Sequence, residues 1–326
     1  MEAYQELEQK FGAWATMPHC VACSSGTSAL HLALEAFKLP PGSAVLLPEF
    51  TMVACARAVT MAGLRPVFVD CTDDLLMDVE QLADLPVFDA RAIMPVHIYG
   101  RRCNMPRIHD LAMQEGLVVV EDCAEIHGAP LSGKADAYCF SFYKNKIVYG
   151  EEGGIVVFAH APHAETAKEL RSHGFTPEHD FLHAPRGVNA RLSNAHASLI
   201  LASFEQMEEN LAKRREVEGW YNELVPQEWH MPAREVCWVY DIRIPKTDLY
   251  AVIKELGEKG IQARHSFKPM SAQPEYQGHF KHLNAFRLSR EVMYLPVYPD
   301  MTRERVEEIV TALKDAVACH SPQSTI

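Results

Sequence analysis

The first two thirds of the sequence alternate short apolar runs with segments of helical periodicity. This alternation is typical of a mostly parallel sheet whose strands are joined by crossover helices. Several runs are continuously apolar, as strands covered on both faces are. The pattern predicts seven strands, at His19–Cys23, Ala44–Leu47, Pro66–Asp70, Ala92–His97, Leu117–Glu121, Ala137–Phe142 and Gly154–Phe158. We therefore expect an α/β fold with a seven-stranded sheet and helices on both faces.

Residues typical of helix starts and ends, and changes in composition, indicate where helices lie. One is expected from Pro106, which suits a first turn, to Gly116, which suits a helix end. A long helix is expected near Ser193–Val217, where the composition turns from apolar to charged. The remainder predicts a strand in YDIRIP, a helix in DLYAVIKELGEKG, a strand in QARHSF and a final helix at Arg303–Val317.

Length and composition limit the domain count and the function classes. The 326 residues suit about two domains, which we place at 1–215 (large) and 216–326 (small, α/β). The net charge of −12, without a basic cluster, argues against nucleic acid as a partner. The acidic, amphipathic start and the absence of a run of about 18 apolar residues argue against secretion and membrane insertion. We expect a cytoplasmic protein.

The nine cysteines are scattered, mostly in apolar runs. This distribution is typical of buried thiols in a reducing compartment. Cys20 and Cys23 form a CxxC pair, but a structural zinc site needs a second ligand pair, and none follows. We expect no metal site.

The segment SSGTSALHLALEAF places Gly26, Thr27 and Ser28 between a strand and an amphipathic helix. Free backbone N–H groups and hydroxyls at a helix N-terminus can bind a phosphate dianion. A Ser/Thr-capped turn without a ligand would have the same sequence. This motif alone leaves both interpretations open.

Asp122 ends the apolar run VVVED, at the sheet edge where open α/β sheets bind ligands. A carboxylate there could pair with a protonated pyridine nitrogen and stabilise its positive charge. It could also be only a helix cap. Glu125 and His127 lie just beyond it.

Two lysines, Lys144 and Lys146, occur in CFSFYKNKIVYGEEGG, where a strand runs into a Gly-rich loop with apolar and aromatic flanks. Lysines are usually solvated, but desolvation lowers the pKa of an amine toward the range in which it attacks an aldehyde. Both are therefore candidate nucleophiles. His97 and Tyr99 in PVHIYG are interpreted as loop structure, and Lys268 is as consistent with surface as with a site.

Seven segments occur together along the chain: SSGTSALHLAL, PVFVD, PVHIYG, EDCAEIHG, SFYKNK followed by GEEGG, GVNARLSNAHASL and FKPMSAQPEY. In this order and near these spacings the chain resembles the DegT/DnrJ/EryC1/StrS family of sugar aminotransferases over nearly its whole length. The resemblance implies the fold-type I architecture of enzymes that depend on pyridoxal 5′-phosphate (PLP).

The resemblance also implies roles for individual residues. Lys146, after Asn in SFYKNK, matches the lysine that forms the Schiff base, and Asp122 matches the partner of the pyridine nitrogen. Further cofactor contacts are implied for Gly26, Thr27, Ser28 and Ser141 at the phosphate, for Glu125 beside the ring, and for Asn189, which reaches the partner subunit's phosphate. The implied assembly is a homodimer with shared active sites; Asn189 could instead cap the helix that begins near Ser193.

Three features depart from the family. An N-terminal arm of about two dozen residues is absent, and the GKADAYCF connection is short. Met52 stands where an aromatic side chain commonly stacks on the cofactor, and Phe50 could compensate. Because loops and arms often shape a sugar pocket, these departures leave the acceptor less well defined than the cofactor, and Met52 leaves open what stacks on the cofactor ring.

The implied activity is amino transfer, with L-glutamate as donor, to a keto-sugar carried on a nucleotide. The alternatives are a PLP-binding regulator without turnover and the family's sugar 3-dehydratase branch, which has His where this chain has Lys146. The sequence does not specify the nucleotide, the sugar or the carbon, although CWVYDIRIP resembles the GDP-perosamine synthase branch.

Overall fold

The computed structural model describes residues 1–82, 89–175, 181–183, 186–277 and 283–321. Its elements up to the end of the large sheet are α1 (Ala3–Ala15), β1 (His19–Cys23), α2 (Gly26–Ala36), β2 (Ala44–Pro48), α3 (Val53–Met61), β3 (Arg65–Val69), α4 (Val79–Leu82), β4 (Ala90–Ile93), η1 (Ile98–Gly100), α5 (Met105–Glu115), β5 (Val118–Asp122), β6 (Ala137–Ser141) and β7 (Gly154–Phe158). The later elements are α6 (Ala161–Arg171), α7 (Asn194–Glu205), α8 (Met207–Leu224), η2 (Gln227–Trp229), β8 (Tyr240–Arg243), α9 (Leu249–Glu258), β9 (Arg264–His265), η3 (Met270–Ala272), η4 (Pro274–Tyr276), α10 (Leu283–Glu291), β10 (Val292–Leu295) and α11 (Arg303–His320).

The seven predicted strands form one sheet, in the order β1-β7-β6-β5-β4-β2-β3. Strand β7 is antiparallel to both of its neighbours, and the other four pairings are parallel. The mostly parallel sheet expected from the sequence is therefore confirmed. The predicted strand Ala92–His97 is wrong at its end, because β4 stops at Ile93 and His97 immediately precedes the 3-10 turn η1.

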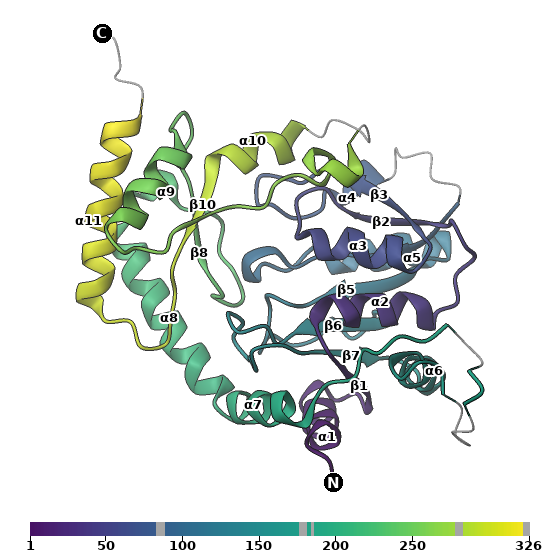
Figure 1. The fold of residues 1–326 in the computed structure, drawn as a ribbon. Coiled ribbons are helices and arrows are strands. Elements are labelled where there is room, and N and C mark those ends of the chain that lie inside the picture. Colours follow the sequence, from purple (N-terminus) through teal and green to yellow (C-terminus); the bar gives the residue numbers. More distant parts are fainter. Residues whose placement is uncertain (83–88, 176–180, 184–185, 278–282, 322–326) are drawn as a thin grey trace.

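Helices cover both faces of the sheet, as Figure 1 shows. Two adjacent residues of β6 demonstrate this, because successive side chains of a strand point to opposite faces. Phe140 packs against Phe11 of α1, whereas Ser141 lies against Gly26 of α2. This explains why the strand residues are almost continuously apolar.

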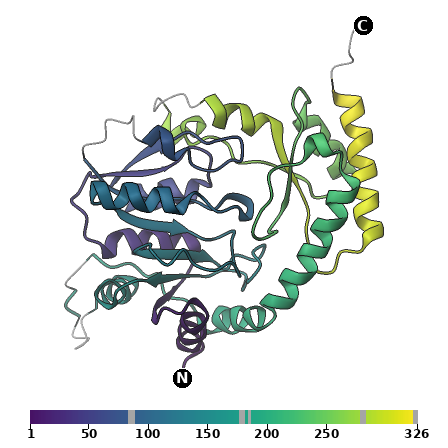
Figure 2. The same ribbon diagram turned by 180° about the vertical axis from the view of Figure 1, so that it is seen from behind.

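The small sheet has the order β8-β10-β9, and all its pairings are antiparallel. Helices α9 and α11 pack on each other beside it, and α8 runs from the large domain toward it (Figures 1 and 2). The predicted single helix at Ser193–Val217 is wrong, because the chain breaks at Gln206 into α7 and α8. The backbone N–H of Gln206 bonds to the carbonyls of Ser203 and Phe204, which tightens the last turn of α7 and ends it.

The buried apolar residues form two hydrophobic clusters, and the larger one also includes residues beyond position 215, such as Trp238, Met270 and Leu288. Leu211 of α8 belongs to the large cluster, whereas Val217 and Tyr221, further along the same helix, belong to the small one. The boundary after residue 215 stays a proposal, because α8 passes through it without interruption. None of the helices in the described part of the chain is long and apolar enough to cross a membrane.

Candidate active site

A cavity of about 460 Å³ lies at the carboxyl ends of the parallel strands. The part of the chain that forms the seven-stranded sheet contributes the start of α2, the end of β5 and the loop between β6 and β7. The second part of the chain contributes three aromatic side chains, Trp238, Phe267 and Tyr294. The volume is in the range of cofactor and small-molecule sites, and the lining combines apolar walls with a few polar groups.

The start of α2 forms one end of this cavity. The N-cap Ser25 accepts a hydrogen bond from the backbone N–H of Ser28, and Ser25, Gly26 and Thr27 line the cavity. A Cβ atom on Gly26 would lie 2.6 Å from Cβ of Ser141, so glycine allows the helix to begin directly against β6. The hydroxyl of Ser28 lies 3.0 Å from the hydroxyls of both Ser24 and Ser25, and Ser28 is not one of the lining residues found in the described chain.

The two candidate lysines have opposite environments. Lys144 is exposed, with Nζ 5.9 Å from the ring centroid of Tyr143. Lys146 is 9% exposed and lines the cavity. Its Nζ lies 3.6 Å from Oε1 of Glu125 and 3.8 Å from the ring centroid of Trp238. Of these two lysines, Lys146 lies in the cavity and Lys144 does not, as far as the described residues show.

Asp122 ends β5, and its carboxylate accepts hydrogen bonds at both oxygens. Oδ1 accepts from the backbone N–H of Ala124 at 3.0 Å, and Oδ2 accepts from the thiol of Cys55 at 3.1 Å. Burial raises the pKa of the Cys55 thiol well above its usual value, and the nearby charge of Asp122 raises it further, so the thiol keeps its proton. Because that proton points to Asp122, the hydroxyl of Thr51, at 3.2 Å, donates to the sulfur. The carboxylate is thus held in one orientation.

Glu125 lies between the amine of Lys146 and the turn η1. Its Oε2 accepts a hydrogen bond of 2.8 Å from the backbone N–H of Tyr99. Burial raises the pKa of Glu125 to about 7, against the opposing effect of Lys146. This carboxyl group therefore changes charge near neutral pH, within the cavity.

Phe50 does not supply the aromatic side chain that position 52 lacks. Met52, the N-cap of α3, is 51% exposed and lines the cavity. Phe50 is fully buried and packs against Tyr99 and Phe267 instead. The expectation that Phe50 takes the place of an aromatic residue at position 52 is therefore wrong.

Asn189 is exposed and pairs by an isolated bridge with Ser172. It does not line the cavity of this chain, as far as the described residues show. The alternative role as a helix cap is wrong, because Ser193 is the N-cap of α7 and accepts from the backbone N–H of His196.

Several functional candidates were not identified from the sequence. They are Cys55, Asn145, Glu152 and the three aromatic residues Trp238, Phe267 and Tyr294. The motif FKPM contains Phe267, and CWVYDIRIP contains Trp238, so both segments carried a signal. Lys268, in contrast, lies with Nζ over the ring of Tyr250 at 4.7 Å and outside the described cavity wall.

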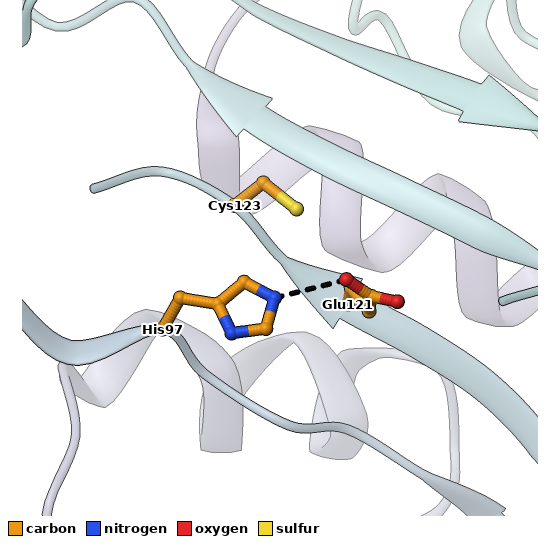
Figure 3. Close-up of side chains that lie close together, drawn as sticks. All are labelled: His97, Glu121 and Cys123. Carbon is orange, nitrogen blue, oxygen red and sulfur yellow. Dashed lines mark hydrogen bonds and ion pairs between the residues drawn. The ribbon is translucent and has the colours of Figure 1, made fainter. Parts of the chain in front are cut away.

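A buried cluster of His97, Glu121 and Cys123 lies beside Asp122, with one ligand-type atom of each within 4.8 Å of the others (Figure 3). Nδ1 of His97 accepts a hydrogen bond from the backbone N–H of Cys103, so the ring proton is on Nε2 and is donated to Glu121 at 2.9 Å. A metal-binding histidine uses one nitrogen for the ion and donates a proton from the other. We interpret the cluster as a hydrogen-bonded support for the PVHIYG and EDCAEIHG segments.

Comparisons with known proteins identify the family of this chain. The sequence model of the DegT/DnrJ/EryC1/StrS aminotransferase family matches residues 2–314. GDP-perosamine synthase of Caulobacter vibrioides is 34% identical, over 94% of this chain and 88% of that protein. UDP-N-acetyl-3-dehydro-α-D-glucosamine 3-aminotransferase of Acidithiobacillus ferrooxidans is 33% identical, over 94% of this chain and 87% of that protein. A crystal structure of a DegT/DnrJ/EryC1/StrS aminotransferase from Brucella abortus superimposes with a TM-score of 0.86 at 26% identity, covering 97% of this chain and 90% of that one.

Proposed function

Because the chain belongs to the DegT/DnrJ/EryC1/StrS aminotransferase family, we propose that it binds PLP and transfers an amino group from L-glutamate to a nucleotide-linked keto-sugar. The observation that carries the proposal is the burial of Lys146 in the same cavity as Asp122. One relative named above is a GDP-perosamine synthase and the other acts on a UDP-linked keto-sugar, which supports a sugar nucleotide as acceptor.

The residues present fit PLP. The close approach of Gly26 to Ser141 makes a cradle that a Cβ would fill, and Ser25, Thr27 and Ser141 line the cavity at this end. The backbone N–H groups at the start of α2 add partial positive charge, which suits the phosphate. Asp122 offers an oriented carboxylate to the ring nitrogen, and Glu125 lies beside Lys146.

When bound, PLP supplies an aldehyde that can carry the amino group and a ring that accepts electrons from the reacting carbon. The amine of Lys146 is buried in the cavity, with Oε1 of Glu125 at 3.6 Å, so it would move the proton between the reacting carbons. Asp122 would keep the ring nitrogen protonated, because its carboxylate is fixed by Ala124 and Cys55. The apolar wall of Trp238, Phe267 and Tyr294 would limit water around these groups.

The lysine assignment is tested by borohydride reduction of the cofactor-bound protein followed by peptide mapping. The pyridoxyl group should be found on Lys146. Lys146→Ala should abolish the yellow absorbance and the transamination, whereas the matched variant Lys144→Ala should retain both, since Lys144 is exposed. A pyridoxyl group on Lys144 would contradict the proposal.

The acceptor is tested with a panel of GDP-, UDP- and dTDP-linked keto-sugars, each assayed with glutamate. The similarity of CWVYDIRIP to the GDP-perosamine synthase branch and the 34% identity to one such enzyme favour the GDP-linked compounds. Faster turnover of a UDP- or dTDP-linked sugar would reassign the nucleotide. If the protein binds PLP but converts none of these sugars, the alternative of a PLP-binding regulator without turnover would be favoured.

We also propose a homodimer in which Asn189 completes the partner's cofactor site. Asn189 is exposed and is not used to cap α7, so its side chain remains available for a second chain. A group that donates to the other subunit's phosphate would link cofactor affinity to association.

A further inference from the structure

Trp238 lines the cavity and is 5% exposed. The face of its indole ring meets the amine of Lys146, with Nζ 3.8 Å from the ring centroid. Tryptophan is the best of the aromatic partners for an ammonium group, and the attraction is stronger when both groups are desolvated. Here both side chains are at least nine-tenths buried.

The same side chain also contacts the peptide that precedes the lysine. Nε1 of Trp238 donates a hydrogen bond of 2.7 Å to the carbonyl of Asn145. One residue therefore fixes both the backbone before Lys146 and the end of its side chain.

A second contact fixes the backbone of Trp238. Nη1 of the buried Arg214, in α8, donates to the carbonyl of Trp238 at 2.9 Å and to that of Val297 at 3.0 Å. The backbone of Trp238 is therefore held by Arg214, and its indole ring by the hydrogen bond to Asn145.

The other neighbour of the amine is Glu125, at 3.6 Å. Because the pKa of Glu125 is raised to about 7, the negative charge that it offers falls as the pH drops below neutral. The ring face of Trp238 does not titrate, so its attraction for a cation does not depend on the charge of Glu125.

We propose that Trp238 is a positioning residue that receives the amino group of Lys146 whenever this group is not bonded to the cofactor. The inference rests on the proposed role of Lys146. In a transaminase the lysine is bonded to the cofactor in the aldehyde state and free in the amine state. A partner that attracts only the free ammonium therefore stabilises the amine-loaded state.

The first test measures the ratio of the two cofactor states by absorbance, at a fixed ratio of glutamate to its keto acid. Trp238→Leu should shift the ratio toward the lysine-bonded state by about threefold to thirtyfold. Trp238→Phe keeps a ring but loses the N–H, so its shift should have the same direction and be smaller. Trp229→Leu is the matched control, because Trp229 packs against the small core and does not line the described cavity. It should leave the ratio unchanged.

The second test needs no cofactor. Apoprotein carrying Lys146→Met, Trp238→Leu or both is unfolded in denaturant, and the coupling between the two sites is calculated from the three variants and the wild type. Coupling of about threefold or more in the unfolding equilibrium constant is expected. If Trp238→Leu does not fold, Trp238→Phe replaces it in both tests.

An unchanged state ratio in a folded, cofactor-binding Trp238 variant, together with no coupling in the apoprotein, would overturn the inference. A purely structural role would lower stability without either effect. Failure of the proposed function is separately visible, because it would place the pyridoxyl group elsewhere or give no cofactor binding at all.

Discussion

At the scale of single residues, two lysines only two positions apart differ completely in environment. The sequence identifies both as candidates, and the family resemblance selects Lys146. The structure gives the physical reason, since Lys144 is in solvent and Lys146 is enclosed by Glu125 and Trp238. Cys55 illustrates the opposite case. Its contact with Asp122 joins residues 67 positions apart, and no local pattern predicts such a contact.

Asp122→Asn should still bind PLP but lose transaminase activity by at least about a hundredfold, because a neutral amide cannot stabilise the pyridinium charge. Binding should survive through the phosphate cradle. Cofactor titration and steady-state rates measure the two effects separately. Asp136→Asn is the matched control, since Asp136 accepts from the backbone N–H of Val119 and does not line the described cavity. Near-normal turnover of Asp122→Asn would remove this residue from the mechanism.

At the scale of elements, the sequence predicts what is locally encoded. All seven strands of the large sheet were located, because buried parallel strands are short apolar runs flanked by helical patterns. Strand β10 was missed, although it is central in the small sheet. Its four residues, Val292–Leu295, follow α10 without a turn signal, and their pairing with β8 and β9 is set by tertiary contact. The break at Gln206 was also missed, because no Gly or Pro marks it; the last turn of α7 is closed by backbone hydrogen bonds of Gln206 to Ser203 and Phe204.

Gly26→Ala tests how α2 meets β6. The added Cβ would meet Ser141 at 2.6 Å, so the helix start must shift. We expect a loss of about 1–3 kcal/mol in unfolding free energy and a marked loss of PLP affinity. Gly219→Ala in α8 is the matched control, because its Cβ would meet nothing within 4 Å. It should stabilise the protein by up to about 1 kcal/mol. Unchanged PLP affinity in Gly26→Ala would argue against the cradle.

At the scale of the whole molecule, the cavity is built from distant parts of the chain, which is why its aromatic wall could not be assembled from the sequence. Glu49, just after β2, makes another contact between distant parts of the chain. Its side chain accepts hydrogen bonds from the backbone N–H and the hydroxyl of Ser271, in η3. Burial raises the pKa of Glu49 from 4.5 to about 7.

A raised carboxyl pKa means that the native state binds the proton more tightly than the unfolded chain does. The contribution of Glu49 to stability should therefore fall as the pH rises from about 4.5 to about 7, by up to about 3 kcal/mol. Glu49→Gln keeps an acceptor for Ser271 and cannot ionise. Its stability relative to wild type should increase across this pH window, as measured by denaturant unfolding. A pH-independent difference would contradict the raised pKa.

The proposed sharing of sites between two chains is tested by mixing. Lys146→Ala is inactive, and Asn189→Ala is expected to be severely impaired. In a heterodimer, one site would carry both lesions and the other neither, so activity should partly return. Heterodimers confirmed by differential tags but without recovery would show that Asn189 does not complete the partner's site.

Eight of the nine cysteines are buried, and Cys319, near the end of α11, is exposed. A maleimide dye added to the folded protein should therefore attach at one position, on the helix farthest along the chain. Denaturation would expose the other eight thiols. The number of dye molecules per chain, read by mass spectrometry, would then count folded and unfolded molecules in one sample, without any engineered label.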